Sequence, residues 1–208
     1  MKKLILLLLA FCLVIPMTYA DKKAEKERKE QLDRSRKIAK NLKKEGWKLH
    51  GSSSDLEEAV IRHHDKMRSV YGGREIVGFA SNVKNKNIGR QKAMNDAYIT
   101  YSQQEGGKIK GGVEQILGTD TSGELDKFYA HYERLIEKEI KGEMQETFTV
   151  IREKKPDLYE FQTFFVVNEQ AAANARMRAV ESAMKDDENA QKHEKEIKEF
   201  VKGGFVVE

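Results

Sequence analysis

Two strand-like runs in the last third of the chain restrict its fold more than any other feature. Met144–Arg152 and Leu158–Val167 are rich in β-branched and aromatic residues, and Lys154-Lys155-Pro156-Asp157 between them is typical of a hairpin turn. Because side chains alternate along a strand, the second run places one row on a single face, which we expect to be core: Tyr159, Phe161, Thr163, Phe165 and Val167. The chain therefore contains an antiparallel hairpin within a sheet.

Helical patterns lie on both sides of this hairpin, and two further strand patterns, Trp47–Leu49 and Glu75–Val83, precede it. The predicted helices carry apolar stripes at these positions: Leu56, Val60, His63, Met67 and Val70; Ala93, Ala97 and Tyr101; Leu125, Phe128, Tyr129, Tyr132, Leu135, Ile136 and Ile140; and Ala172, Ala175, Ala179 and Ala183. The order β-α-β-α-α-β-β-α predicts an α+β fold with a single mixed or antiparallel sheet, packed by helices on one face and preceded by a charged helical arm.

Local signals predict where these helices begin and end. Three helix starts carry capping residues: Ser54 with Glu57, Thr121 with Glu124, and Asn168. The glycine-rich segment Gly106–Gly112 is expected to be a mobile or tightly turning connection between two helices. The last helix is expected to continue past Asp186-Asp187 and to end at Gly203-Gly204.

The first twenty residues have the pattern of a secretory signal peptide. Lys2 and Lys3 precede the apolar run Leu4–Ile15, which is too short to span a bilayer, and Pro16 is expected to end this helix. Thr18-Tyr19-Ala20 supplies the small residues of a cleavage site, so residues 1–20 are predicted to be removed. Two alternatives remain: acylation of Cys12, against which bulky Phe11 argues, and an uncleaved anchor.

Residues 21–45 form a charged arm ahead of a body that we place at residues 46–208. The arm holds 11 Lys or Arg against 6 Asp or Glu, whereas the body carries a net charge of about −3. Helix formers dominate and apolar residues are sparse, which favours a solvated helical spacer. The functional alternatives are contact with anionic lipid head groups or polymers, and packing as a short partner helix.

Composition excludes several classes of protein. A mean hydropathy of −0.69 excludes a multi-span membrane protein, and a single Cys excludes a disulfide framework or a multi-Cys metal site. The net charge of +4 is too small to predict nucleic-acid binding, which needs a clustered basic surface. Without its signal peptide the chain has no Cys, which suits an oxidising compartment.

Histidine supplies the most chemically suggestive cluster, His63-His64-Asp65. Adjacent residues on a helix point about 100° apart, so the two histidines cannot face one metal ion. We expect His63 at the edge of the core and His64 in solvent. Three other histidines are scattered and can meet a partner only through tertiary contact: His50, His131 and His193.

Other candidate residues lack the spacing that a known chemistry requires. Ser52–Ser54 have no nucleophile-elbow pattern, and Gly72-Gly73 and Gly106–Gly112 match neither a phosphate-binding nor a dinucleotide-binding loop. For Lys108 and Lys110 we expect a flexible connection, with contact to an anion as the alternative. Glu57-Glu58 and Asp186-Asp187 are expected to be solvated surface. Tyr159, Phe161 and Phe165 are expected to be sheet core, with stacking on sugar as the alternative. We therefore assign no catalytic, cofactor-binding or metal-binding residue, and no cofactor.

The middle of the chain resembles a known family. Ile76-Val77-Gly78-Phe79-Ala80, a short polar turn and the helical run Arg90–Ala97, with Phe164-Phe165-Val166-Val167 further on, are similar to the lipoprotein-twenty family. That family comprises small bacterial envelope domains related to the amino-terminal domain of flagellar assembly protein T. The resemblance covers roughly residues 75–167 and implies an envelope-associated α+β module that works by association. It implies no catalytic residues, and the chain departs from the family in lacking a lipobox.

Together these features predict an exported, non-enzymatic envelope protein in the periplasm or on the periplasmic face of the outer membrane. Its expected partner is an envelope protein or a cell-wall component, with peripheral membrane contact through the arm. One alternative is a periplasmic binding protein for a small or lipidic ligand in a cavity lined by Phe, Tyr and Met. Another is a hydrolase, which a carboxylate and a concave pocket beside His63 or His131 would favour.

Overall fold

The computed structural model describes residues 2–204, with side chains from Lys22 onward. The elements follow in this order: α1 (Lys2–Lys44), β1 (Lys48–Leu49), α2 (Leu56–Ser69), β2 (Arg74–Val83), α3 (Lys86–Leu117), α4 (Thr119–Gly123), α5 (Asp126–Ile140), β3 (Met144–Lys155), β4 (Leu158–Val167), α6 (Glu169–Met184), α7 (Glu188–Lys192) and α8 (Glu194–Lys202). The α+β class and the predicted order of the main elements are confirmed. Residues 205–208 of the predicted body lie outside the described part.

The strands form one antiparallel sheet in the order β1-β3-β4-β2. The predicted hairpin joins β3 to β4 through Pro156 and Asp157, and Asp157 has a φ of 57°, a left-handed conformation that Asp tolerates in turns. β2 returns along the other edge of β4, with Arg74 opposite Val167. Of the two sheet types expected from the sequence, the antiparallel one is present.

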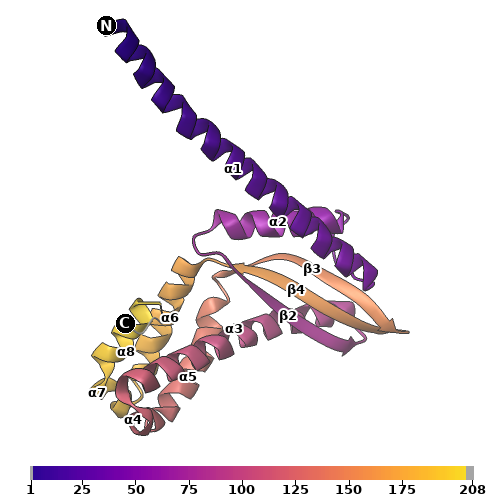
Figure 1. Cartoon of the computed structure of the whole chain (residues 1–208). Coiled ribbons are helices and arrows are strands. Elements are labelled where there is room, and N and C mark those ends of the chain that lie inside the picture. Colours follow the sequence, from indigo (N-terminus) through magenta and orange to yellow (C-terminus); the bar gives the residue numbers. More distant parts are fainter. Residues whose placement is uncertain (1, 205–208) are drawn as a thin grey trace.

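Helices cover both faces of the sheet, where the sequence analysis expected one (Figure 1). Phe165 packs into the large core formed with α3, α5, α6 and α8, whereas its neighbour Phe164 packs into a smaller core beneath α1 and α2. Trp47 is 2% exposed in this second core. The second layer exists because the end of the predicted arm is part of the body.

α3 lies close against the sheet because small residues meet at the contact. Ala93 and Ala97 are fully buried, as predicted, and a Cβ on Gly78 of β2 would lie 1.9 Å from the Ala93 carbonyl oxygen. Gly89 likewise leaves room for the ring of Phe161, which a Cβ would approach to 2.1 Å. Gly78 thus brings the backbone of β2 against that of α3, and Gly89 brings the backbone of α3 against an aromatic ring.

The prediction of a connection at Gly106–Gly112 is wrong, because α3 continues through this segment to Leu117. Gly106 and Gly112 are buried, and Gly112 faces the ring of Phe200 on α8. Gly112 thus gives room for close packing inside a helix, and tertiary contact outweighs its low helix propensity.

Two of the predicted helix starts are also wrong. Asp55, not Ser54, caps α2 by accepting a hydrogen bond from the Glu57 N–H, and α5 starts at Asp126 without a side-chain cap. Asn168 caps α6 as predicted. The single last helix is instead three helices, because Asp187 accepts a hydrogen bond from the Ala190 N–H and starts α7.

α1 is one continuous helix that passes through Pro16, where the sequence analysis expected an end. The helix continues past Pro16 despite the missing backbone donor, although Val14, Ile15, Thr18 and Tyr19 beside it have only modest helix propensity. Side chains 22–30 are exposed, whereas Ser35 and Ala39 are each 1% exposed against the body. The interpretation of the whole arm as a solvated spacer therefore fails for its second half. Among the residues that the structure describes, no helix is both long and apolar enough to cross a membrane.

Candidate functional site

The junction between α2 and the sheet encloses His63, whose exposed fraction is 1%. Its Nδ1 lies 2.7 Å from Thr147 Oγ1, and its Nε2 lies 2.6 Å from Glu75 Oε2 at an angle outside hydrogen-bond geometry. Phe148 and Phe164 pack edge-on to the ring. The expected position at the core edge is confirmed, and both ring nitrogens face protein groups.

His64 lies against α1, so the expectation that it points into solvent is wrong. Its Nδ1 is 2.7 Å from Ser35 Oγ, which itself donates to the Gln31 carbonyl oxygen. The Ser35 proton is thus already used, and this contact fits the tautomer of His64 that carries its proton on Nδ1. Burial, followed by the charge of neighbouring His63, lowers the pKa of His64. The two histidines bind different elements, the sheet and α1, as their helical spacing requires.

A hollow of about 430 Å³ opens at the edge of β3, beyond the point where β1 ends. Its lining includes Thr147, His50 and Ser52, with guanidinium groups from Arg62 and Arg90. Arg62 pairs with Glu58 and Arg90 with Glu146, so both cations are already neutralised. Burial, followed by Arg90 and Lys86, lowers the pKa of His50. The hollow is polar and its charges are paired within the chain.

A second hollow of about 430 Å³ lies where α1 separates from α2. Ile38 and Met67 supply its apolar part, and charged side chains from both helices surround them: Glu27, Glu30, Arg34 and Arg68. Ile38 is 41% exposed, although a large apolar side chain is usually buried. This notch marks the place where the exposed part of α1 leaves the body.

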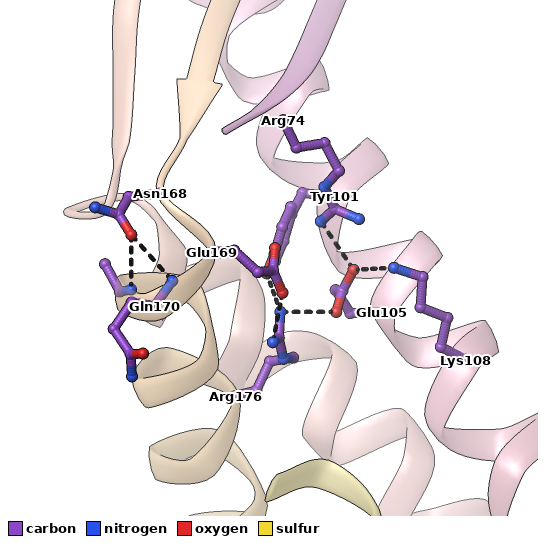
Figure 2. Close-up of polar contacts among 9 residues, drawn as sticks. Arg74, Tyr101, Glu105, Lys108, Asn168, Glu169, Gln170 and Arg176 are labelled. Atoms are coloured by element: carbon purple, nitrogen blue, oxygen red, sulfur yellow. Dashed lines mark hydrogen bonds and ion pairs between the residues drawn. The ribbon is translucent and has the colours of Figure 1, made fainter. Parts of the chain in front are cut away.

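A buried ionic network joins α3, α6 and β2 (Figure 2). Glu105 has no exposed side-chain surface and lies 2.9 Å from Arg74, 2.9 Å from Lys108 and 3.4 Å from Arg176. Arg176 is 2% exposed by side chain and also pairs with Glu169 at 2.6 Å. The three cations and two carboxylates lock the elements together, since a buried charge requires a partner.

Two tyrosines lie against this network. Burial, followed by the charge of Glu105, raises the pKa of Tyr101 to about 12, and Arg176 donates to its hydroxyl over 3.3 Å. Burial also raises the pKa of Tyr132, whose hydroxyl has no hydrogen-bond partner among the described residues. Both phenols remain neutral at physiological pH, which suits a packing role.

Sequence reasoning missed this network, although a signal for it exists. Arg176 follows Ala172 by four positions on the buried stripe of α6, and Glu105 follows Tyr101 by four on that of α3. A charged residue at such a position indicates a buried ion pair. Its partner comes from another element, so spacing within one helix cannot identify it.

The other candidates stay separate. His131 Nδ1 lies 3.6 Å from Asp186 Oδ2, and both line a hollow of about 510 Å³ on α5 and α6. His193 joins α7 to α8, far along the chain from His50 and His63. Lys110 pairs with Asp126, Glu57 with Arg36, and Phe161 and Phe165 are core residues.

Comparison with protein-family models, curated proteins and solved structures finds no match to this chain.

Proposed function

We propose that this chain is an exported, non-enzymatic protein of the bacterial cell envelope that acts as a structural or interaction module. Its body docks on an envelope protein or a cell-wall component, and α1 sets the position of the body. The support is the signal-peptide pattern, the resemblance of residues 75–167 to envelope domains, and the joint between α1 and the body. The periplasm, or the periplasmic face of the outer membrane, is the proposed location.

The joint of α1 is the observation that carries this proposal. Ser35 and Ala39 are buried, and ion pairs Arg36–Glu57 at 3.1 Å and Lys43–Asp55 at 2.8 Å connect α1 to α2 and its cap. Residues 22–30 continue the same helix without buried contact. A rod fixed at one end holds a body at a defined distance and angle, which is a mechanical task and requires no chemistry.

Site-specific cross-linking in cells tests the docking proposal. A photoreactive residue replaces one exposed apolar side chain of the body at a time. The positions are Tyr71, Ile88 and Phe79, which are 77%, 52% and 43% exposed. Exposed Lys195 is the matched control position. One abundant envelope partner captured from one face, and not from Lys195, is expected. Equal capture of many proteins from every position would refute a specific docking surface.

A cavity for a small or lipidic ligand is the alternative that the sequence analysis raised. Its expected lining residues instead fill the core, where Tyr101, Phe128, Tyr132, Phe161 and Phe165 are at most 1% exposed. The hollow at the edge of β3 is lined mainly by polar groups, whereas the notch between α1 and α2 has an apolar floor inside a ring of charged side chains. The packing therefore supports the docking proposal better.

A hydrolase is the second candidate, because His131 and a carboxylate share a hollow. At His63 the contacts oppose it: Thr147 Oγ1 donates to the Phe164 carbonyl oxygen, so its proton is engaged within the sheet and not held toward His63 Nδ1. Assays with ester, amide and phosphoester substrates test the candidate. Turnover that His131→Asn abolishes, while the control His193→Asn leaves it intact, would replace the docking proposal.

A further inference from the structure

The outer side of α1 carries a row of lysines that the body does not use. The row consists of six lysines, spaced three or four residues apart except for one interval of about two turns between Lys29 and Lys37: Lys22, Lys26, Lys29, Lys37, Lys40 and Lys44. At about 100° per residue these positions fall within about 80° of one another on the helix surface. Ser35 and Ala39 face the opposite way, into the body. We call this row the lysine ridge.

The ridge lysines are free to meet an external anion. All six are exposed, and within the described residues none has a carboxylate partner. Asp33 is the acidic residue inside the row, and Arg36, which also pairs with Glu57 at 3.1 Å, lies 3.7 Å from it. Glu30 borders the row, whereas Glu25 and Glu27 lie on the flanks of the helix. The ridge is therefore a positive line about 33 Å long.

We propose that the lysine ridge binds the surface of an anionic phospholipid membrane, which places α1 flat on the head groups. This inference rests on the proposed export of the protein to the envelope and names the lipid surface as a partner of α1. Ammonium groups are compact, strongly hydrated charges that suit diffuse attraction to many phosphates. Residues 22–44 contain no aromatic side chain, so contact is electrostatic and without insertion.

The geometry favours a flat anionic surface. α1 is a straight helix whose end packs against α2 (Figure 1). The six ridge lysines lie in one line on it, on the side opposite the buried Ser35 and Ala39. The body carries a net charge of about −3 and is repelled by the same surface. Attraction of the ridge and repulsion of the body together orient the molecule with α1 between lipid and body.

Vesicle binding tests the inference, with the protein purified as cells export it. The probes are vesicles of phosphatidylglycerol, vesicles of phosphatidylcholine, and soluble inorganic polyphosphate. We expect binding to phosphatidylglycerol that weakens steeply as salt rises, and little binding to phosphatidylcholine. Each lysine near such a surface changes affinity by about fivefold, so the ridge variant K22Q/K29Q/K40Q should bind on the order of 100-fold more weakly.

The matched control is K185Q/K195Q/K202Q, which removes the same charge from exposed positions on and near α6 and α8. It should change affinity less than about twofold. Equal binding to both lipids, equal losses in the two triple variants, or binding to polyphosphate without binding to vesicles would each overturn the inference. Gln keeps helix propensity, so circular dichroism of both variants should show an intact α1. Because no protein partner takes part, failure here is separable from failure of the docking proposal.

Discussion

At the scale of single residues, two neighbouring glycines of α3 have opposite surroundings and test whether the helix is packed as described. A Cβ on Gly112 would lie 1.8 Å from Phe200 Cζ, whereas a Cβ on Gly111 would meet nothing within 4 Å. Gly112→Ala should lower the free energy of unfolding by about 1–3 kcal/mol through overpacking. Gly111→Ala should raise it by about 0.5–1 kcal/mol, because Ala costs less backbone entropy in a helix. Urea unfolding followed by circular dichroism measures both, and changes of the same sign would contradict the packing of α3 against α8.

The buried carboxylate of Glu105 gives a second prediction at this scale. Glu105→Gln removes the negative charge that compensates Arg74 and Arg176. It should lower the free energy of unfolding by about 3–5 kcal/mol. Glu139→Gln is the matched control, because Glu139 pairs with half-exposed Arg178 and should cost less than about 1 kcal/mol. Adding Arg176→Met to Glu105→Gln should recover part of the loss, since it removes the uncompensated charge. A strictly additive double variant would show that the two groups do not interact.

At the scale of elements, the hairpin, the alanine stripes and the cap at Asn168 follow from the sequence because their causes are local. Turn residues, strand alternation and helical spacing all act within about ten residues. The continuity of α3 could not be predicted in this way. Gly112 packs against Phe200, which lies far along the chain and is brought there only by the tertiary structure. The docking of α1 was missed for a similar reason. Ala39 is buried in the core that it shares with Trp47, α2 and the sheet, and Ser35 contacts His64 on α2. No periodicity within the arm indicates these partners.

The candidate site shows the same division. Helical spacing correctly separates the orientations of His63 and His64, but their partners Thr147, Glu75 and Ser35 come from other elements. Arg176 and Glu105 stand on buried stripes and could have been found as buried charges. Their pairing with each other needs the tertiary structure.

His64 gives the prediction that belongs to this junction. Its pKa in the folded state lies below the value of 6.5 for a free side chain, so the unfolded chain binds more protons near and below pH 6.5. The stability that docked His64 contributes is therefore complete above about pH 7 and is lost as the pH falls toward its folded pKa. Groups from every packed element face it: Ser35 and Gln31 on α1, His63, Asp65 and Arg68 on α2, and Glu75 on β2.

We expect amide hydrogens of α1 after Gln31 to exchange faster at pH 5.5 than at pH 7.5, once corrected for intrinsic rates. His64→Gln keeps a donor for Ser35 but cannot titrate, so it should reduce this difference. The pKa of His50 is also lowered, but His50 lies at the edge of β3 and not against α1. His50→Gln therefore serves as the matched control. An equal pH response in the wild type and in His64→Gln would exclude His64 as its source.

At the scale of the whole molecule, the body and α1 form one mechanical unit with separated charge. The basic ridge faces outward, the acidic body lies behind it, and the joint at Ser35 and Ala39 fixes their relation. Rigidity is the property that makes this arrangement useful, because a flexible arm would allow the body any orientation. The helical phase of α1 should then determine which face of the body meets its partner.

Insertions between Glu27 and Arg28 test that rigidity without touching the joint, because residues 22–30 have no buried contact. Seven inserted helix-forming residues lengthen α1 by about 10 Å and rotate it by only about 20°, whereas five rotate it by about 140°. Both variants should keep the free energy of unfolding of the wild type. With a rigid α1, cross-linking from the docking face should survive the seven-residue insertion far better than the five-residue one. Equal cross-linking yields from the two variants would show that α1 acts as a flexible tether. The joint would then fix the body relative to the end of α1, but α1 would not fix the body relative to the envelope.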